Sequence, residues 1–192
     1  MVIMELKLTS KMPPSVNHYL GYRSFKGHVS VYVKTGAKKY KNEFANYVAS
    51  EIQAQNWNIP VTKYQHFYVD MDFYFPRIDM DAPNYDKCLL DAITDSGLIW
   101  EDDNVVCSRV NHIYYDNKNP RIELTIKPVD YIGIFDNMNL YQQFVNKCNN
   151  CSRFDRGCSL LNRAIEGRIQ DEIINFECSK YKTKKMDKRR IK

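Results

Sequence analysis

The feature that most constrains the fold is a strict alternation of apolar and polar residues over positions 67–75. An apolar side chain stands at every odd position from Phe67 to Phe75, and Tyr or Asp stands at every even one. This period of two is typical of a β-strand with one buried face. Pro76 cannot donate a ladder hydrogen bond, so the strand is predicted to end there. The chain then runs directly into a segment rich in aspartate.

The remaining patterns predict an α/β (α+β) domain with a mixed β-sheet and two main helices over residues 1–129. Alternating, β-branched or aromatic residues predict strands over 4–9, 29–33, 105–115 and 121–127. Residues 116–120 are predicted to be a hairpin-type connection between the last two. Apolar residues at helical spacing predict helices over 35–55, with Thr35 as N-cap, and over 84–95, with Gly97 just beyond the end.

A chain of 192 residues has room for one ordinary domain and a small appendage. We expect residues 130–179 to form the appendage and residues 180–192 to be a basic, disordered tail. The composition, 44% hydrophobic and 27% charged, is that of a globular protein. No apolar run is long enough to cross a bilayer, and the first residues do not read as a signal peptide. We therefore expect a cytoplasmic protein with no membrane partner.

Charge is strongly segregated along the chain. The net charge of +5 comes from the tail, where eight basic residues face only Asp187. Residues 7–41 contain eight bases and no acid, whereas residues 70–103 contain ten acids against Arg77 and Lys87. A basic arm beside a carboxylate cluster favours a protein that binds nucleic-acid phosphates and cuts one with metal ions. The alternative is that both segments are solvated faces.

The acidic segment contains a candidate metal site. Asp79 and Asp81 are separated by one residue just beyond the predicted strand, and Asp102 lies in a later acidic turn. Carboxylate oxygens are the ligands that Mg²⁺ prefers, with water in the other positions. Such a site can activate a water and stabilise charge on a phosphodiester, and Lys87 would add a positive charge. Aspartates in loops are also common as turn formers and caps.

Four motifs follow one another along the first unit of the sequence. They are Pro13-Pro14-Ser15-Val16-Asn17-His18-Tyr19, the aspartate motif from Asp79 to Lys87, Asp91-Ala92, and Glu101-Asp102-Asp103. With these motifs in this order, residues 6–128 resemble the RusA family of Holliday-junction resolvases. The resemblance implies a homodimeric endonuclease that resolves branched DNA in recombination or repair, with Mg²⁺ (or Mn²⁺) held by aspartates. For the DNA surface we expect Asn17, Tyr19, Lys38 and Lys39, although the two prolines could simply stiffen a loop.

The aspartate motif departs from the compact Asp-x-Asp-Asn of that family. Counting back from Lys87 and Asn84 puts Asp81 at the first aspartate and Pro83 at the second. If two residues are inserted instead, Asp79 and Asp81 are the pair. We favour the insertion because it keeps both carboxylates, with Asp102 as the third ligand. Asp103 and Asp91 are weaker candidates, and Asp86 is expected to be solvated.

The cysteines fall into two groups. Cys88 and Cys107 stand in apolar surroundings and are expected to be small buried side chains. Cys148, Cys151, Cys158 and Cys178 form a set that begins with a C-x₂-C pair. With no His in this region, a Cys₄ site for structural Zn²⁺ is predicted. The irregular spacing leaves an iron–sulfur cluster or a disulfide as alternatives.

Two classes of function therefore remain. The first is a metal-dependent, structure-selective endodeoxyribonuclease that hydrolyses phosphodiester bonds. The second is a DNA-binding accessory protein that keeps the fold but has lost catalysis through its altered aspartate motif. Both bind branched DNA, so only a cleavage assay separates them.

Overall fold

The structure is a computed structural model that describes residues 4–168 and 171–184. The chain divides into two compact units, Met1–Pro128 and Val129–Lys192, which we describe separately. None of the helices described is both long and apolar enough to cross a membrane.

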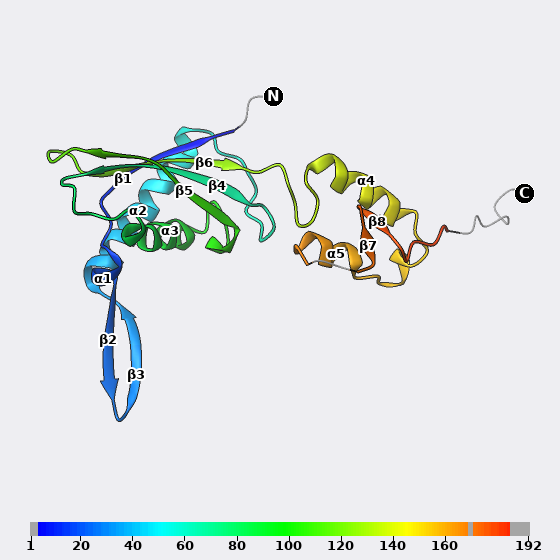
Figure 1. The fold of residues 1–192 in the computed structure, drawn as a ribbon, viewed down its shortest axis with the longest axis horizontal. Coiled ribbons are helices and arrows are strands. Elements are labelled where there is room, and N and C mark those ends of the chain that lie inside the picture. The colour runs from blue at the N-terminus through cyan, green and yellow to red at the C-terminus, as the bar shows by residue number, and fades with distance from the viewer. Residues whose placement is uncertain (1–3, 169–170, 185–192) are drawn as a thin grey trace, which may run out of the picture. The chain divides into compact units, whose positions relative to one another are not determined.

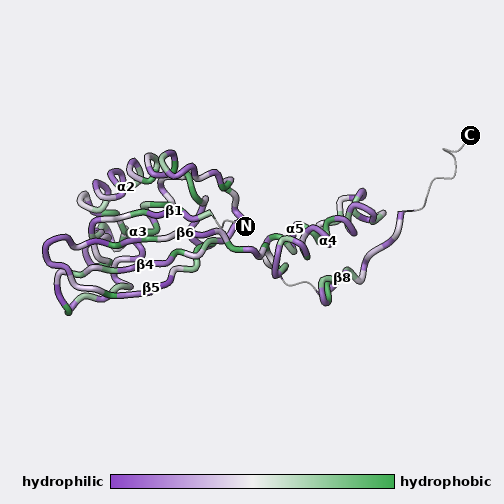
Figure 2. Tube along the Cα trace, turned by 90° about the horizontal axis from the view of Figure 1, so that it is seen from above, coloured by the Kyte–Doolittle hydropathy of each residue, from purple (hydrophilic) through white to green (hydrophobic). Residues whose placement is uncertain are grey.

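The first unit is built on a four-stranded mixed sheet (Figure 1). Its strands are β1 (Leu6–Lys11), β4 (Phe67–Phe75), β5 (Val106–Tyr115) and β6 (Arg121–Pro128), in the order β1-β6-β4-β5. β6 pairs antiparallel with both β1 and β4, whereas β5 pairs parallel with β4. The predicted mixed sheet is therefore confirmed, and β5 forms one edge of it, as Figure 2 shows.

Two main helices cover one face of this sheet, α2 (Thr35–Ala54) and α3 (Pro83–Ser96). The odd residues of β4, which alternate in the sequence with Tyr and Asp, are 0% exposed and form the centre of the core. Tyr40, Phe44 and Val48 of α2 and Leu89 and Ile93 of α3 join the same core. α2 begins at Thr35, with Lys34 and not Thr35 as its N-cap residue. α3 ends at Ser96, and Gly97 follows it, just beyond the helix as predicted, in the left-handed conformation that favours glycine.

A short helix and a hairpin precede α2. α1 (Val16–Tyr19) leads into β2 (Leu20–Phe25), which pairs with β3 (His28–Val33) outside the main sheet (Figure 1). Lys26 and Gly27 make the turn with φ angles of 48° and 79°, the type that matches strand twist in tight hairpins. β2 was not expected from the sequence, because Gly21 and Arg23 interrupt its alternation.

The end of the first unit differs from the sequence-based expectation. β5 and β6 are not hydrogen-bonded to each other, since β4 lies between them. Residues 116–120 therefore cross the end of β4 instead of forming a hairpin turn. Cys88 is buried as expected, but Cys107 is exposed because β5 is an edge strand.

The second unit has its own small core. Its elements are α4 (Met138–Asn149), η2 (Phe154–Arg156), α5 (Leu160–Ile165), β7 (Ile173–Ile174) and β8 (Glu177–Cys178). Phe135, Phe144, Leu161 and Ala164 form the core. Gly133 packs so closely on α5 that an added Cβ would lie 2.0 Å from the Ala164 carbonyl oxygen, so only glycine fits there.

Part of the predicted tail is structured. The amide of Ser152 donates to the Lys182 carbonyl at 2.8 Å, and Thr183 forms a β-bridge with Cys151. Residues 180–184 therefore pack onto the second unit, contrary to the expected disorder. The rest of that tail, residues 185–192, lies outside the described residues.

Candidate active site

The loop between β4 and α3 carries the two carboxylates predicted to pair on a metal. Asp79 and Asp81 are both exposed. Arg77 Nε lies 2.8 Å from Asp79 Oδ1, and Asn84 Nδ2 lies 3.5 Å from Asp81 Oδ2. Burial raises the pKa of Tyr85; Arg77 opposes this, while Asp79 and Asp81 add to it. Asp79 and Asp81 therefore both lie close enough to the Tyr85 phenol to raise its pKa.

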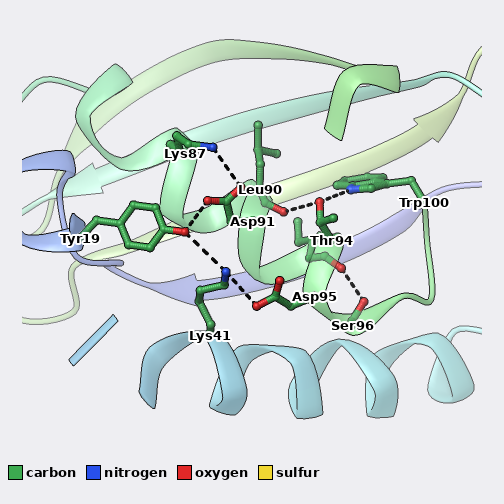
Figure 3. Close-up of polar contacts among 10 residues, drawn as sticks. Tyr19, Lys41, Lys87, Leu90, Asp91, Thr94, Asp95, Ser96 and Trp100 are labelled. Atoms are coloured by element: carbon green, nitrogen blue, oxygen red, sulfur yellow. Dashed lines mark hydrogen bonds and ion pairs between the residues drawn. The ribbon is translucent and has the colours of Figure 1, made fainter. Parts of the chain in front are cut away.

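A polar network joins the start of α3 to α1 (Figure 3). Lys87 Nζ lies 3.2 Å from Asp91 Oδ1, one helical turn away, and the Tyr19 hydroxyl donates to Asp91 Oδ2. Burial, followed by the hydrogen bond to Asp91, raises the pKa of Tyr19, which keeps the phenol protonated as a donor. Asp91 therefore restrains Lys87 from one side and is itself held by Tyr19.

A second ion pair in this network comes from α2. Lys41 Nζ lies 2.8 Å from Asp95 Oδ2 and 3.5 Å from the Tyr19 hydroxyl (Figure 3). The Lys41 side chain is only 12% exposed, so the pair clamps α2 to α3. Tyr19 is 3% exposed in this arrangement. Its position differs from the DNA contact predicted for it, because its hydroxyl is used inside the protein.

The other residues predicted to meet DNA lie on the surface. Asn17 is exposed on α1, and its carbonyl accepts a hydrogen bond from Lys34 Nζ at 3.0 Å. Lys38 and Lys39 are exposed in the first turns of α2. Lys39 Nζ lies 3.8 Å from Glu43, a weak, solvent-screened contact that leaves the lysine accessible.

The acidic turn after α3 contains the third predicted ligand. Asp102 is exposed and caps η1 (Asp103–Val105) by accepting the Asn104 amide at 3.0 Å. Two residues earlier, Trp100 is fully buried against Phe67, with ring centroids 5.7 Å apart, and donates Nε1–H to Thr94. Trp100 therefore fixes this turn near the beginning of β4.

The first two aspartates are fixed at the other end of β4. Tyr85, four residues after Asp81, packs on Phe75 with ring centroids 5.7 Å apart. The nine residues of β4 separate Phe67 from Phe75 by about 26 Å at the usual rise per residue. Within one chain, Asp102 therefore does not join Asp79 and Asp81, contrary to the three-carboxylate cluster that we expected.

The sequence did not lead us to expect that Asp86 is partly buried. This residue of α3 was expected to be solvated, but burial raises its pKa to about 6. Its Oδ1 is buried and has no hydrogen-bond partner. Asp86 lies three residues before the buried Leu89 and so on the buried side of α3. That spacing is the signal of burial that the sequence carried.

The four predicted zinc ligands gather in the second unit. Cys148, Cys151, Cys158 and Cys178 all line one cavity of about 440 Å³. Burial raises the pKa of Cys148 to about 11, and the other three thiols act in the same direction. Burial also acts to raise the pKa of Cys151, but the amides of Lys182, Arg153 and Phe154 outweigh it and lower that pKa.

Across residues 4–168 and 171–184, no three His, Cys, Asp or Glu side chains are close enough together to hold a metal ion. The cysteines line a shared cavity without closing on one point, and the aspartates are divided between two ends of the first unit. Each set is therefore a group of candidate ligands and not a formed metal centre.

Comparison with known proteins identifies the family. The family model described as Endodeoxyribonuclease RusA matches residues 11–127, which include α1, the loop with Asp79 and Asp81, Lys87 and the acidic turn. No curated protein matched the chain. The match covers more than half of the sequence and nearly all of the first unit. The chain therefore belongs to the RusA endodeoxyribonuclease family.

Proposed function

We propose that this protein is a Mg²⁺-dependent endodeoxyribonuclease that resolves Holliday junctions or related branched DNA in recombination or repair. The match to the RusA family over residues 11–127 carries the proposal. The exposed carboxylates of Asp79 and Asp81, in the loop before α3, and the exposed ammonium of Lys87, within α3, support it, because they offer oxygen ligands and a cation for a phosphate. The experiment that tests it is cleavage of a four-way junction by the purified protein with Mg²⁺.

Within one chain, the residues that would hold Mg²⁺ (or Mn²⁺) are Asp79 and Asp81, because Asp102 lies at the other end of β4. Their side chains are exposed and make few contacts that would compete with a cation. When bound, the ion lowers the pKa of a ligated water and offsets negative charge on the phosphate. Binding a cation here is electrostatically favourable because several carboxylates otherwise repel one another.

Lys87 is proposed as the catalytic cation. It is 57% exposed and is oriented by Asp91, so its ammonium group can reach a phosphate outside the helix. Asp91 in turn is fixed by Tyr19. Tyr19 is therefore proposed as a positioning residue, which links the Pro-Pro-Ser element to the catalytic helix without touching DNA.

The proposed DNA surface is the hairpin β2–β3 and the start of α2. Arg23 and Lys26 of the hairpin and Lys38 and Lys39 of α2 are exposed, with Asn17 nearby in the chain. Tyr22 and Phe25 are 69% and 72% exposed on the same hairpin and can stack on unpaired bases. The N-terminus of α2 adds a partial positive charge that favours phosphate.

We expect Arg23→Gln combined with Lys26→Gln to weaken junction binding about tenfold. The slope of log affinity against log salt concentration should also become shallower, by the amount that corresponds to about two lost phosphate contacts. The side chains lie outside the core, so folding should be unaffected. Fluorescence titration of a labelled junction at several salt concentrations measures both effects. Lys118→Gln, an exposed change in the loop between β5 and β6, is the control and should leave affinity unchanged. Unchanged binding by the double variant would remove the hairpin from the DNA surface.

We also propose that the second unit binds one structural Zn²⁺ through Cys148, Cys151, Cys158 and Cys178. The shared cavity supports this, as does a hydrogen bond from the Lys182 amide to Cys151 Sγ at 3.4 Å. Backbone amides that point at a sulfur stabilise a thiolate, which is the form that binds zinc. We place this module at residues 130–179, and the packing of residues 180–184 extends it slightly.

A further inference from the structure

We propose that a basic cavity in the second unit binds the phosphate backbone of DNA, whatever the base sequence. The basic cavity has a volume of about 860 Å³, and all its lining residues belong to the second unit. The inference rests on the proposed DNA substrate. It adds a second contact surface for that substrate, which cutting a phosphodiester does not itself require.

The cavity carries a large excess of positive charge. Its cations are all exposed, and they are Arg153, Arg156, Arg163, Lys180 and Lys182. Glu172 is the one carboxylate among the described residues that line it. A hollow with this excess of one sign concentrates a positive potential and attracts polyanions.

The cavity cations are not neutralised by neighbouring carboxylates. Other basic residues of the second unit form ion pairs, namely Lys147 with Glu177, Arg168 with Glu166, and Lys184 with Asp155. Within residues 129–168 and 171–184, none of the cavity cations forms such a pair. Unpaired like charges that are gathered in one place repel one another, and a bound polyanion relieves this repulsion.

Two structured parts of the unit hold the three arginines. Arg153 is the N-cap residue of η2, and Arg156 is the last residue of that turn. Arg163 lies on α5, which is anchored because its Leu161 and Ala164 belong to the core of the unit. The arginine backbones are therefore fixed by the fold, while their exposed side chains line the cavity.

The two lysines come from the chain after β8. The Ser152 amide donates to the Lys182 carbonyl at 2.8 Å, and the Lys184 amide donates to the Asn150 carbonyl at 3.2 Å. These bonds attach residues 182–184 to residues 150–152. Lys180 and Lys182 therefore line the same cavity as arginines from earlier in the chain. The segment that was expected to be disordered completes the cavity.

The lining is suited to phosphate and not to bases. A guanidinium group can donate two parallel hydrogen bonds to one phosphate, and the lysine ammonium adds a point charge. The hydroxyls of Ser152, Ser159 and Thr183 also line the cavity and can donate to phosphate oxygens. Leu160 is the one large apolar side chain among the described lining residues, and no aromatic ring is among them. Bases would therefore find no platform on which to stack.

DNA is the polyanion that the rest of the chain favours. The first unit belongs to a family of endodeoxyribonucleases, so both units of one chain would meet the same substrate. Two linked contacts on one molecule bind more tightly than either alone, because the first raises the effective concentration of the second. The basic cavity would therefore strengthen binding of a junction with long duplex arms without taking part in the chemistry.

Arg156→Gln combined with Arg163→Gln tests the cavity in the full-length protein. Affinity for a four-way junction with long duplex arms, titrated in Ca²⁺, should fall about tenfold. The slope of log affinity against log salt concentration should become shallower by about two, because two phosphate contacts are lost. Single-turnover cleavage at saturating junction in Mg²⁺ should keep the wild-type rate, since the proposed metal ligands lie in the first unit.

Two further variants separate a phosphate site from a general effect of charge. Lys118→Gln combined with Lys147→Gln removes the same charge from exposed positions outside the cavity, and should bind the junction as wild type does. Arg156→Lys combined with Arg163→Lys keeps both cations and should restore most of the affinity that the glutamines lose. Circular dichroism and resistance to proteolysis check that each variant folds.

Wild-type affinity in the Arg156→Gln/Arg163→Gln protein would overturn the proposal, as would an equal loss in the Lys118→Gln/Lys147→Gln control. Inorganic phosphate that binds only when the arginines are present, with DNA affinity independent of them, would identify a free-anion site instead. Tighter arginine-dependent binding of duplex RNA than of duplex DNA would overturn the choice of DNA. Arginine-dependent DNA binding by a wild-type protein that cuts no branched DNA would count against the proposed function alone.

Discussion

Asp81→Asn should reduce Mg²⁺-dependent junction cleavage by about 10³-fold while leaving junction affinity nearly unchanged. Asp81 is the proposed ligand that both possible registers of the aspartate motif share. The change removes a negatively charged oxygen from the proposed metal site but alters the side-chain volume little. A rate loss of about 10³-fold corresponds to the loss of several kcal/mol of transition-state stabilisation. Single-turnover cleavage of a labelled four-way junction gives the rate, and a binding titration in Ca²⁺ gives the affinity.

The same measurement on Asp79→Asn separates the two registers. Loss of cleavage would support the inserted register, in which Asp79 and Asp81 are the pair. Normal cleavage would mean that the direct count from Lys87 holds, with Pro83 at a ligand position. Glu43→Gln, a partly exposed carboxylate of α2 that pairs with Lys11 and Lys39, is the control and should cleave normally. Near-normal cleavage by Asp81→Asn would refute the site.

Replacing Cys148 and Cys151 by Ser should release one Zn²⁺ per chain and unfold the second unit. Among the described residues of that unit, four buried side chains form the core, so its stability should depend strongly on the metal. We expect limited proteolysis to cut the double variant after Ile132 at least about tenfold faster than wild type. The first unit should stay folded and keep its Mg²⁺-dependent cleavage, because its proposed ligands lie elsewhere.

Cys107→Ser is the matched control, since Cys107 is an exposed thiol outside the set. It should retain zinc and resist proteolysis as wild type does. Elemental analysis of the purified protein that shows no zinc, or iron in its place, would refute the cofactor. Loss of cleavage by a double variant whose first unit is folded would show that the two units depend on each other.

Local patterns predicted most of the first unit. β4 occupies the residues whose alternation defined it, and α3 begins and ends within one residue of its predicted limits. These elements follow from side-chain periodicity and from stop signals at Pro76 and Gly97. β2 was missed because Gly21 and Arg23 interrupt its alternation, and because most of its side chains are exposed in a hairpin that pairs outside the main sheet.

Strand order and the position of Asp102 could not be predicted in the same way. The expected hairpin at residues 116–120 rested on turn composition, but β4 inserts between β5 and β6. The parallel pairing of β4 with β5 then carries Asp102 away from Asp79 and Asp81. Likewise, Tyr19 became an internal donor because Asp91 lies 72 residues later on a helix packed beside it. Long-range packing decides each case, and one sequence does not reveal it.

Incubation of the wild-type protein with a synthetic four-way junction and Mg²⁺ tests the central claim most directly. We expect paired nicks placed symmetrically across the junction, produced with Mg²⁺ and absent when EDTA replaces it. Linear duplex of the same sequence should be cut far more slowly. Tight binding of the junction without nicks, in Mg²⁺ and in Mn²⁺, would contradict the account and identify the protein as a junction-binding accessory factor without nuclease activity.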